Sequence, residues 1–531
     1  MASIALVLMV CFLGFFVPAP SLASSSNDTD FLRCISTGVP SQLVQTPNSP
    51  SFRQLLVSSI RNARFVAPAT ASPPLCIVTP TNASHVQAAV RCGRRHGVRV
   101  RVRSGGHDYE GLSYRSVHPN SEAFAVIDLA KLHAVRVDPR KATAWVDSGA
   151  SIGDLYYHVA TADPRLGFPA GVCSTVGLGG HFSGAGMGLM MRKYGLSADN
   201  VLDATMVDAY GNLLADKKAM GDDLFWAIRG GGGGNFGIVL SWKVRLVPVP
   251  PTVAFFKLAK TMDQGAVNAV TKWQTLAPAL PDDLTIRVIV ENRRANFEAL
   301  YLGKCAAVVP TLRSRFPELG VTHADCKEMS WLQYTAYRYY GDSTINRSMA
   351  LGPFIRVNCT LVPYLLTNKS DYVQKALTNE TWEKIFLWPK DAVSGQLVLE
   401  PHGGRMGHIA ANDTPFPHRS SVLYNIQYVE HWNGKGPGGD LTPTPNWIGS
   451  LYDFMAQFVS KNPRAAYVNY QDLDIGVNTV VGGVTSYESG KVWGERYFGP
   501  ANFRRLAEVK RRVDAGDYFR NEQSVPPLPL N

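Results

Sequence analysis

A cysteine stands inside a glycine-rich run, GVCSTVGLGGHFSGAGMGLM, at residues 171–190. Glycine lets the backbone approach a bound molecule closely, because it carries no side chain. A cysteine that only forms a disulfide needs no such surroundings, so Cys173 is a candidate for contact with a ligand. The alternative, that Cys173 is a small buried thiol, stays open on glycine content alone. The run predicts a fold that presents a glycine-lined loop.

The first residues have the character of a secretion signal. Residues 4–18 are apolar and uncharged, and small residues follow as far as Ala23. We expect residues 1–23 to be a removed signal peptide, although the leader lacks Lys or Arg. An anchoring helix is the weaker alternative, because the run is short, Pro18 and Pro20 interrupt it, and no later stretch is long enough to span a bilayer. Seven Asn-x-Ser/Thr sequons agree with secretion: Asn27, Asn82, Asn346, Asn358, Asn368, Asn379 and Asn412.

Length, charge and cysteine count narrow the class of protein. A chain of 531 residues, 45% hydrophobic and 18% charged, is expected to form at least two globular domains. A formal net charge of +11 in a secreted protein favours acidic polysaccharides as partners rather than nucleic acid. Loss of Cys11 with the leader leaves seven of the eight cysteines. An odd number in an oxidising compartment leaves at least one thiol outside disulfides, and Cys173 is the candidate.

Short strands alternate with helices from Pro73 onward. Expected strands at 76–80 and 98–103 flank a helix at 83–97, and the second strand runs directly into the loop SGGHDYEG. A second glycine run, RGGGGGNFG, contains the Gly-x-Gly-x-x-Gly spacing of dinucleotide-binding loops. We reject that interpretation, because a dinucleotide loop opens a helix whereas these glycines precede an expected strand. Five glycines before a strand instead indicate a flat backbone surface against a planar or phosphorylated ligand.

The segment VPVPP at 247–251 marks the expected domain boundary, since consecutive prolines stiffen a linker. Beyond it, expected strands such as LTIRVIVENR and FEALYLG alternate with the expected helix AAVVPTLRSRFPEL, a pattern typical of an α+β domain. In VLYNIQYV the period of two places Asn425 and Gln427 on one strand face. A pair of amides can bind hydroxyl groups in a cavity, and a solvent-facing edge is the alternative. Tyr470 in AAYVNYQDLDIG is by itself an ordinary structural tyrosine.

Several motifs together cover nearly the whole mature chain and occur in a characteristic order. They are FLRC, RSGGHDYEGLSY, the Cys173 run, DLFWAIRGGGGGNFGIV, AYVNYQDLDIG, WGERYFG, NFRRLAEVK and NEQSVPPLP. In these motifs the chain resembles the berberine bridge enzyme family of plants, flavoproteins of the vanillyl-alcohol oxidase superfamily. The resemblance implies an α+β fold of two domains. The implied FAD-binding domain spans 24–250, a substrate domain with an antiparallel sheet spans 251–470, and 471–531 return to the FAD domain.

The resemblance also implies that His107 and Cys173 both bond covalently to the flavin of FAD. Imidazole and thiolate are nucleophiles able to add to an electron-poor flavin. The remaining implied FAD contacts are Arg103, Ser104, Gly105, Gly106, Asp108, Val176, Gly177, Leu178, Gly179, Gly180, His181, Gly234 and Val239. The family's disulfide corresponds to Cys34 and Cys92, and the pairing of Cys76, Cys305, Cys326 and Cys359 stays open. No metal is expected.

For catalysis the resemblance implies Tyr470 as base, Tyr109 as its support, and Asn425 and Gln427 on the substrate side. A free tyrosine titrates at about pH 10, so Tyr470 needs a stabilised phenolate or a concerted proton transfer. Relatives that oxidise lignin-type alcohols often carry lysine at the position of Asn425. The chain therefore departs from those relatives at Asn425. It departs from the family again at Met187, where tyrosine is common.

The expected function is a secreted FAD-dependent oxidase that oxidises an alcohol or hemiacetal, here an oligosaccharide at its anomeric carbon. Val176 and His181 fit reoxidation of the flavin by molecular oxygen, which yields hydrogen peroxide. The alternatives are an oxidase of monolignol-type aromatic alcohols, an alkaloid oxidase, and an inactive cell-wall glycoprotein. We expect a monomer in the apoplast or cell wall, associated with wall polysaccharide, with no nucleic-acid partner and no membrane span.

Overall fold

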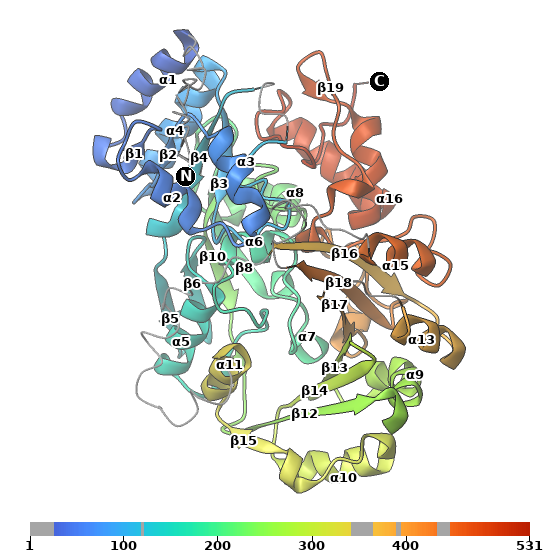
Figure 1. The fold of residues 1–531 in the computed structure, drawn as a ribbon. Helices are drawn as coiled ribbons and strands as arrows, with labels where there is room; N and C mark the ends of the chain where they lie inside the picture. Colours follow the sequence, from blue (N-terminus) through green and yellow to red (C-terminus); the bar gives the residue numbers. More distant parts are fainter. Residues whose placement is uncertain (1–25, 118–121, 341–364, 389–393, 433–446, 531) are drawn as a thin grey trace, which may run out of the picture.

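The computed structural model of the chain describes residues 26–117, 122–340, 365–388, 394–432 and 447–530. The expected signal peptide, the sequons at Asn346 and Asn358, and Cys359 lie outside these residues. Within the described ranges, none of the helices combines the length and the apolar character that a membrane crossing requires. Figure 1 shows the N-terminal elements gathered at one end and a large sheet at the other.

The expected strand, helix, strand unit is present near the N-terminus. Its elements are β1 (Val44–Gln45), β2 (Ile77–Val78), α4 (Ala83–His96), β3 (Arg99–Arg103) and β4 (Phe124–Asp128), in the sheet order β1-β2-β4-β3. Helix α4 begins where the Asn82 side chain accepts a hydrogen bond from the backbone of His85. It ends at Gly97, whose φ of 70° is left-handed and suits glycine. The unit delivers the SGGH loop at the end of β3.

A second, antiparallel sheet carries the other glycine run. Its strands are β5 (Val135–Asp138), β6 (Thr143–Asp147), β8 (Val201–Val207), β9 (Leu213–Leu214) and β10 (Ile238–Arg245), in the order β5-β6-β10-β8-β9. Gly232, Gly234 and Gly237 all have positive φ and lead into β10 rather than into a helix. The structure thus agrees with rejecting a dinucleotide-binding loop here.

The largest sheet has seven strands, all antiparallel to their neighbours. In spatial order they are β15 (Lys327–Met329), β12 (Val253–Thr261), β14 (Arg294–Tyr301), β13 (Leu284–Glu291), β17 (Ser394–Pro401), β18 (Tyr424–Trp432) and β16 (Leu365–Val373). Because side chains alternate along a strand, the sheet has two unlike faces. One face is apolar, with Val288, Phe297, Leu399 and Ile426 in a single core. The opposite face is largely polar.

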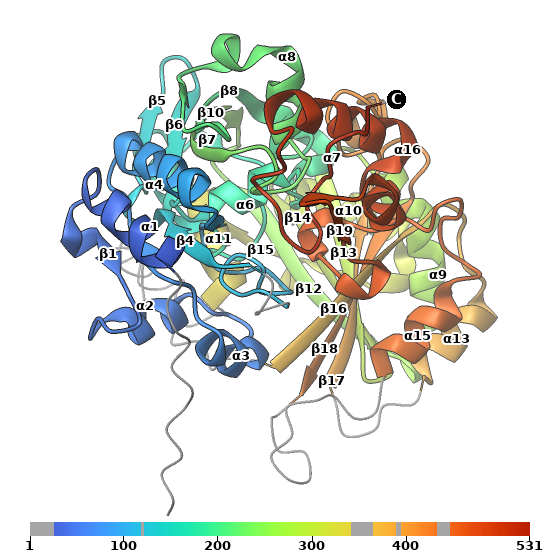
Figure 2. The same cartoon turned by 90° about the horizontal axis from the view of Figure 1, so that it is seen from above.

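Helices cover the apolar face of this sheet. They are α9 (Ala266–Leu276), α10 (Cys305–Arg315), α13 (Asn379–Phe386) and α15 (Trp447–Met455). Figure 2 shows α9, α13 and α15 on one side of the strands and the N-terminal elements on the other. The polar face, which will be called the inner face, is therefore directed toward the glycine loops.

The end of the chain returns to its beginning. Helix α16 (Tyr487–Val513), broken at Gly499 and Pro500, packs beside α8 (Lys217–Ile228). After α16, Glu522 forms an ion pair with Arg101 of β3 at 3.0 Å, with both side chains nearly buried. The last residues of the chain therefore brace the strand that carries the SGGH loop.

Two disulfides form within the described ranges. Cys34 and Cys92 are joined, which confirms the pairing implied by the resemblance. Cys305 and Cys326, whose pairing the sequence left open, form the second disulfide. Cys76 is a buried thiol, and burial raises its pKa to about 12. Cys173 is exposed and belongs to neither disulfide.

Candidate functional site

The SGGH loop is fixed by a buried ion pair at its first residue. Arg103 is fully buried, and its guanidinium contacts Asp128 at 2.5 Å and donates to the carbonyl oxygens of Leu55 and Leu56. The Arg103 side chain is therefore engaged within the core, and only its backbone remains for a cofactor. The Asp108 carboxylate likewise accepts hydrogen bonds from the backbone of Glu110 and Ser113 and so closes its own loop.

The two predicted anchor loops lie directly against each other. A Cβ added to Gly105 would come within 2.4 Å of the Gly177 backbone nitrogen, so neither loop tolerates a side chain there. Across the same contact, His107 Nε2 lies 3.0 Å from the Thr175 hydroxyl oxygen. Thr175 is two residues from Cys173, so the loop that carries one proposed flavin attachment point contacts the other.

The chemical state of these residues suits attachment. Burial, reinforced by the positive charge of Arg61, lowers the pKa of His107 to about 3, which keeps the imidazole neutral and nucleophilic. Cys173 is exposed at the surface of its loop and close enough to Tyr109 that their charges interact. Covalent attachment needs a neutral imidazole and a thiol that is accessible and can ionise to the thiolate.

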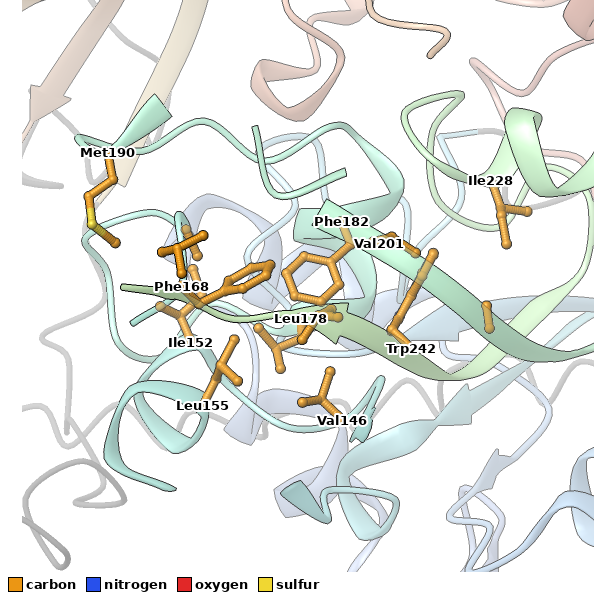
Figure 3. Close-up of a cluster of buried hydrophobic side chains, with 14 of the residues drawn as sticks. Val146, Ile152, Leu155, Phe168, Leu178, Phe182, Met190, Val201, Ile228 and Trp242 are labelled. Atoms are coloured by element: carbon orange, nitrogen blue, oxygen red, sulfur yellow. The ribbon is translucent and has the colours of Figure 1, made fainter. Parts of the chain in front are cut away.

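The glycines after Cys173 sit on a short helix that the core holds in place. In α6 (Leu178–Ser183), Leu178 and Phe182 point into the apolar cluster, where Phe182 packs edge to face on Trp242 (Figure 3). Gly180, on the same helix, is exposed, and a Cβ added there would meet no atom within 4 Å. The helix thus buries its apolar residues and presents bare backbone on its open side.

Exposed glycines from two runs face each other. A Cβ added to Gly233 would lie 4.0 Å from Gly180 Cα, and one added to Gly234 would meet nothing within 4 Å. Val239, further along the second run, is partly buried in β10. Bare backbone on two sides, next to a histidine and a thiol, fits the pyrophosphate and ring of FAD, because unobstructed N–H groups can approach an anion. The residues present therefore fit FAD.

His181 belongs to the same glycine-rich run as Cys173. Its Nε2 accepts a hydrogen bond from the Gly171 backbone at 3.2 Å, and its pKa is lowered to about 4 by burial. The ring is therefore neutral and fixed in place. Val176, between Cys173 and His181, packs partly buried against the apolar cluster.

Three tyrosines assemble the proposed catalytic centre. Tyr470 lies in a short 3-10 turn (Val468–Tyr470), and its ring meets Tyr109 and Tyr467 edge to face, with centroids 5.9 Å and 4.9 Å away. The Tyr467 hydroxyl accepts from the backbone nitrogens of Gly186 and Met187. Burial raises the pKa of Tyr109 to about 12 and that of Tyr470 well above its ordinary value. Both phenols are therefore protonated at rest.

The two predicted amides lie on the inner face of the sheet. Gln427 donates to the Tyr109 hydroxyl at 2.8 Å and to Asn368 Oδ1 at 2.9 Å. Asn425 is completely buried beside the His402 ring, and in the described part of the chain neither its amide atoms nor the two ring nitrogens form a hydrogen bond of good geometry. The expectation that both amides share a face is right, and the alternative of a solvent-facing edge is wrong. Asn425 keeps a donor and an acceptor for a polar ligand.

Sequence reasoning missed Glu400 and Asn368. Glu400 faces Asn425 across the β17–β18 pair, and its charge raises the pKa of Tyr470 and Tyr109, after the larger effect of burial. Its signal in the sequence is a lone carboxylate at the end of the apolar run LVLE. Asn368 sits in a sequon, which draws attention to glycosylation instead, yet it is buried against Gln427.

Comparison with known families agrees with this geometry. Residues 74–216 match the family model described as FAD binding domain, and residues 466–526 match the model described as berberine and berberine like. The first match contains both anchor loops, and the second contains the three-residue turn that ends at Tyr470.

Known proteins resemble the chain over nearly its whole length. The curated protein Berberine bridge enzyme-like Cyn d 4 of Cynodon dactylon is 53% identical over 96% of this chain and 95% of its own length. Two structures of the grass pollen allergen Phl p 4 each cover 94% of this chain and 100% of their own. The wild type, described as a glucose dehydrogenase, has 49% identity and a TM-score of 0.89. A doubly substituted variant, described as a glucose oxidase, has 50% identity and a TM-score of 0.90.

Proposed function

Because the chain belongs to the berberine bridge enzyme-like family of FAD-dependent oxidoreductases, we propose that it oxidises a carbohydrate at its anomeric carbon. The donor would be a reducing sugar, from glucose to an oligosaccharide, and the product a lactone. The observation that carries the proposal is the buried pair Asn425 and His402, whose polar atoms form no hydrogen bond of good geometry within the described residues. An unpartnered amide is costly unless a ligand hydroxyl both donates to it and accepts from it.

Along its own strand the wall beside Asn425 is neutral, whereas the Glu400 carboxyl faces it from β17. Gln427 and Tyr109 are joined by a hydrogen bond, and Gln427 is held in turn by Asn368. Neutral groups that both donate and accept suit the dense hydroxyls of a sugar better than an apolar ring would. The lysine that often accompanies oxidation of lignin-type alcohols is replaced here by Asn425, which weakens that alternative.

In the proposed reaction FAD, when bound, accepts the hydride from the anomeric carbon. Tyr470 takes the proton of the anomeric hydroxyl, and Tyr109 orients it through their ring contact. Because the pKa of Tyr470 lies well above its ordinary value, a resting phenolate is disfavoured. Proton removal is therefore concerted with hydride loss and needs a further acceptor for the phenol proton. We also propose that His107 and Cys173 both attach the flavin.

Oxygen is the proposed electron acceptor. The Phl p 4 variant described as a glucose oxidase has isoleucine replaced by valine and asparagine by histidine, whereas the wild type is described as a dehydrogenase. Those two positions have the same spacing as Val176 and His181, and this chain carries valine and histidine there. The match in residue type and spacing supports oxidase behaviour.

The proposed setting is extracellular. The two disulfides fit an oxidising compartment, and the basic charge of the chain would favour acidic wall polysaccharide. We propose that the mature protein is secreted to the apoplast or cell wall, where a soluble sugar donor and oxygen are both available.

The test is anaerobic mixing of the purified flavoprotein with glucose, cello-oligosaccharides, galacturono-oligosaccharides or coniferyl alcohol, followed by flavin absorbance. We expect bleaching by at least one reducing sugar and a lactone or its acid as product. The matched control is the methyl glycoside of the same sugar, whose anomeric oxygen has no proton to give and which should not bleach the flavin. Bleaching by coniferyl alcohol alone would assign an aromatic alcohol oxidase, and no bleaching by any donor would favour an inactive glycoprotein.

A further inference from the structure

A row of polar side chains crosses the inner face of the seven-stranded sheet. Lys257, Glu298, Arg287, Glu400 and Asn425 come from the consecutive strands β12, β14, β13, β17 and β18. Each is directly opposite the next or in ionic contact with it, and the first four alternate in charge. The row runs from Lys257, whose side chain is 53% exposed, to the buried amide of Asn425.

Two carboxylates in this row compete for one guanidinium. Arg287 Nε donates to Glu298 at 2.8 Å, whereas Arg287 Nη1 is 3.7 Å from Glu400, beyond hydrogen-bond distance. Glu298 has two further cations, Arg338 at 3.0 Å and Lys257 at 3.3 Å. The carboxylate of Glu298, next to Lys257 in the row, is thus richly paired, and that of Glu400, next to Asn425, is loosely paired.

Glu400 has few other charges around it. The titratable or charged groups that act on it, or on which its charge acts, are Arg287, Arg338, Tyr109, Tyr372, Tyr467 and Tyr470. Burial raises its pKa, and Arg287 and Arg338 oppose the increase. A negative charge on Glu400 disfavours a negative charge on Tyr470. A proton that enters this pair of residues is therefore expected to reside on the Glu400 carboxylate.

We infer that Glu400 holds the proton released by the sugar hydroxyl, and that Glu298, by competing for Arg287, sets how tightly Glu400 holds it. The inference rests on the proposed function. The hydroxyl proton goes to the Tyr470 oxygen, and the phenol proton is relayed to the Glu400 carboxylate through a water molecule bound between them. Two electrons leave with the carbon-bound hydrogen to FAD, so the sugar becomes a lactone and Glu400 becomes neutral. Glu298 is a positioning residue, since it acts through Arg287.

Two variants are expected to move the proton affinity of Glu400 in opposite directions. Glu298→Gln releases Arg287 toward Glu400, so the acid limb of the rate of anaerobic flavin reduction by glucose should move to lower pH by about one unit. Arg287→Lys keeps one charge but loses the fork that reaches both carboxylates, so the limb should move to higher pH. The second variant also keeps the test informative if Glu298→Gln fails to fold.

A second readout needs no substrate. The infrared carbonyl band of a protonated carboxyl is titrated in the holoprotein, and the band lost in Glu400→Gln identifies the residue. The pH midpoint of the Glu400 band should fall in Glu298→Gln and rise in Arg287→Lys. The matched control is Glu430→Gln, on the opposite face of β18, which should leave the Glu400 midpoint unchanged. An unchanged midpoint in both row variants, or shifts in the same direction, would overturn the inference. If no sugar reduces the wild-type flavin but the midpoints shift as expected, only the proposed donor fails.

Discussion

The rings of Tyr470 and Tyr109 meet edge to face, with their centroids 5.9 Å apart and their planes at 89°. Tyr109 follows the SGGH loop early in the chain, and Tyr470 lies in a turn close to the C-terminal segment. The contact therefore joins a residue beside a proposed flavin attachment point to the proposed base. Edge-to-face packing fixes the ring of Tyr470 without occupying its hydroxyl.

Replacing Tyr470 with phenylalanine keeps this ring packing and removes only the hydroxyl. We expect the rate of anaerobic flavin reduction by the active sugar to fall roughly 10²–10⁴-fold, the usual size of a general base effect. Stopped-flow absorbance measures the rate, and the resting flavin spectrum should be unchanged. Tyr210→Phe, an exposed tyrosine, is the control and should react as the wild type does. A Tyr470→Phe rate within a factor of about two of wild type would remove Tyr470 from the proton transfer.

Denaturation tests the two attachments. In His107→Ala or Cys173→Ala we expect flavin to remain with the acid-precipitated protein through the other residue, and in the double variant we expect its complete release. Absorbance of the supernatant measures release. Cys76→Ala serves as control, because burial raises the pKa of that thiol to about 12 and keeps it unreactive. Release of all flavin from the wild type would contradict both attachments.

Oxygen use is expected to depend on the volume of Val176. Val176→Ile adds one methylene beside the proposed flavin and should slow reoxidation by oxygen roughly tenfold, a barrier increase of about 1.4 kcal/mol. The reduced enzyme is mixed with oxygenated buffer, and the return of flavin absorbance is followed. Reduction by sugar and reoxidation by dyes should keep their wild-type rates. Equal oxygen rates in both proteins would mean that another residue controls oxygen access.

The sequon at Asn368 should carry no glycan in the folded protein. Its side chain is 4% exposed, and Oδ1 accepts the hydrogen bond from Gln427, so a sugar there would force β16 out of the sheet. Asn379 and Asn412 are exposed and serve as internal controls. Peptide mass mapping of the secreted protein should show unmodified Asn368, and a glycan on it in active protein would show that this part of the site is arranged differently.

Stability should depend on pH through Glu110. This partly buried carboxyl accepts a hydrogen bond from the Leu473 backbone at 3.4 Å and lies 3.9 Å from Arg115, and burial raises its pKa to about 7. The folded state binds the proton more tightly than the unfolded chain, where a glutamate titrates at about 4.3. The stability that protonated Glu110 adds to the folded state is complete below about pH 4.3. It is lost as the pH rises through the folded-state pKa of about 7.

Relative to Glu110→Gln, the wild-type free energy of unfolding should therefore fall by on the order of 2 kcal/mol between about pH 4.5 and 7.5. Denaturant titrations at a series of pH values measure the difference. Parallel pH profiles for the two proteins would show that Glu110 is ionised in the folded state at neutral pH.

Local sequence patterns predicted part of the candidate site. The rest depends on how segments distant in the sequence pack together. The period of two placed Asn425 and Gln427 on one face, because alternation is a property of a single strand. Glu400 was missed because its proximity to Asn425 depends on the register between β17 and β18, which packing sets and no local pattern encodes. The Cys305–Cys326 disulfide depends in the same way on how α10 and the segment before β15 pack.

The ion pair between Arg101 and Glu522 sets an order of events during synthesis. The strand that carries the SGGH loop is made early, and Glu522, which braces it, follows 421 residues later. Tyr470 also emerges after both glycine runs. A nascent chain can therefore complete its proposed flavin site only after residue 522 has been made, so cofactor capture becomes a late step of folding, and a chain terminated before that residue should fail it.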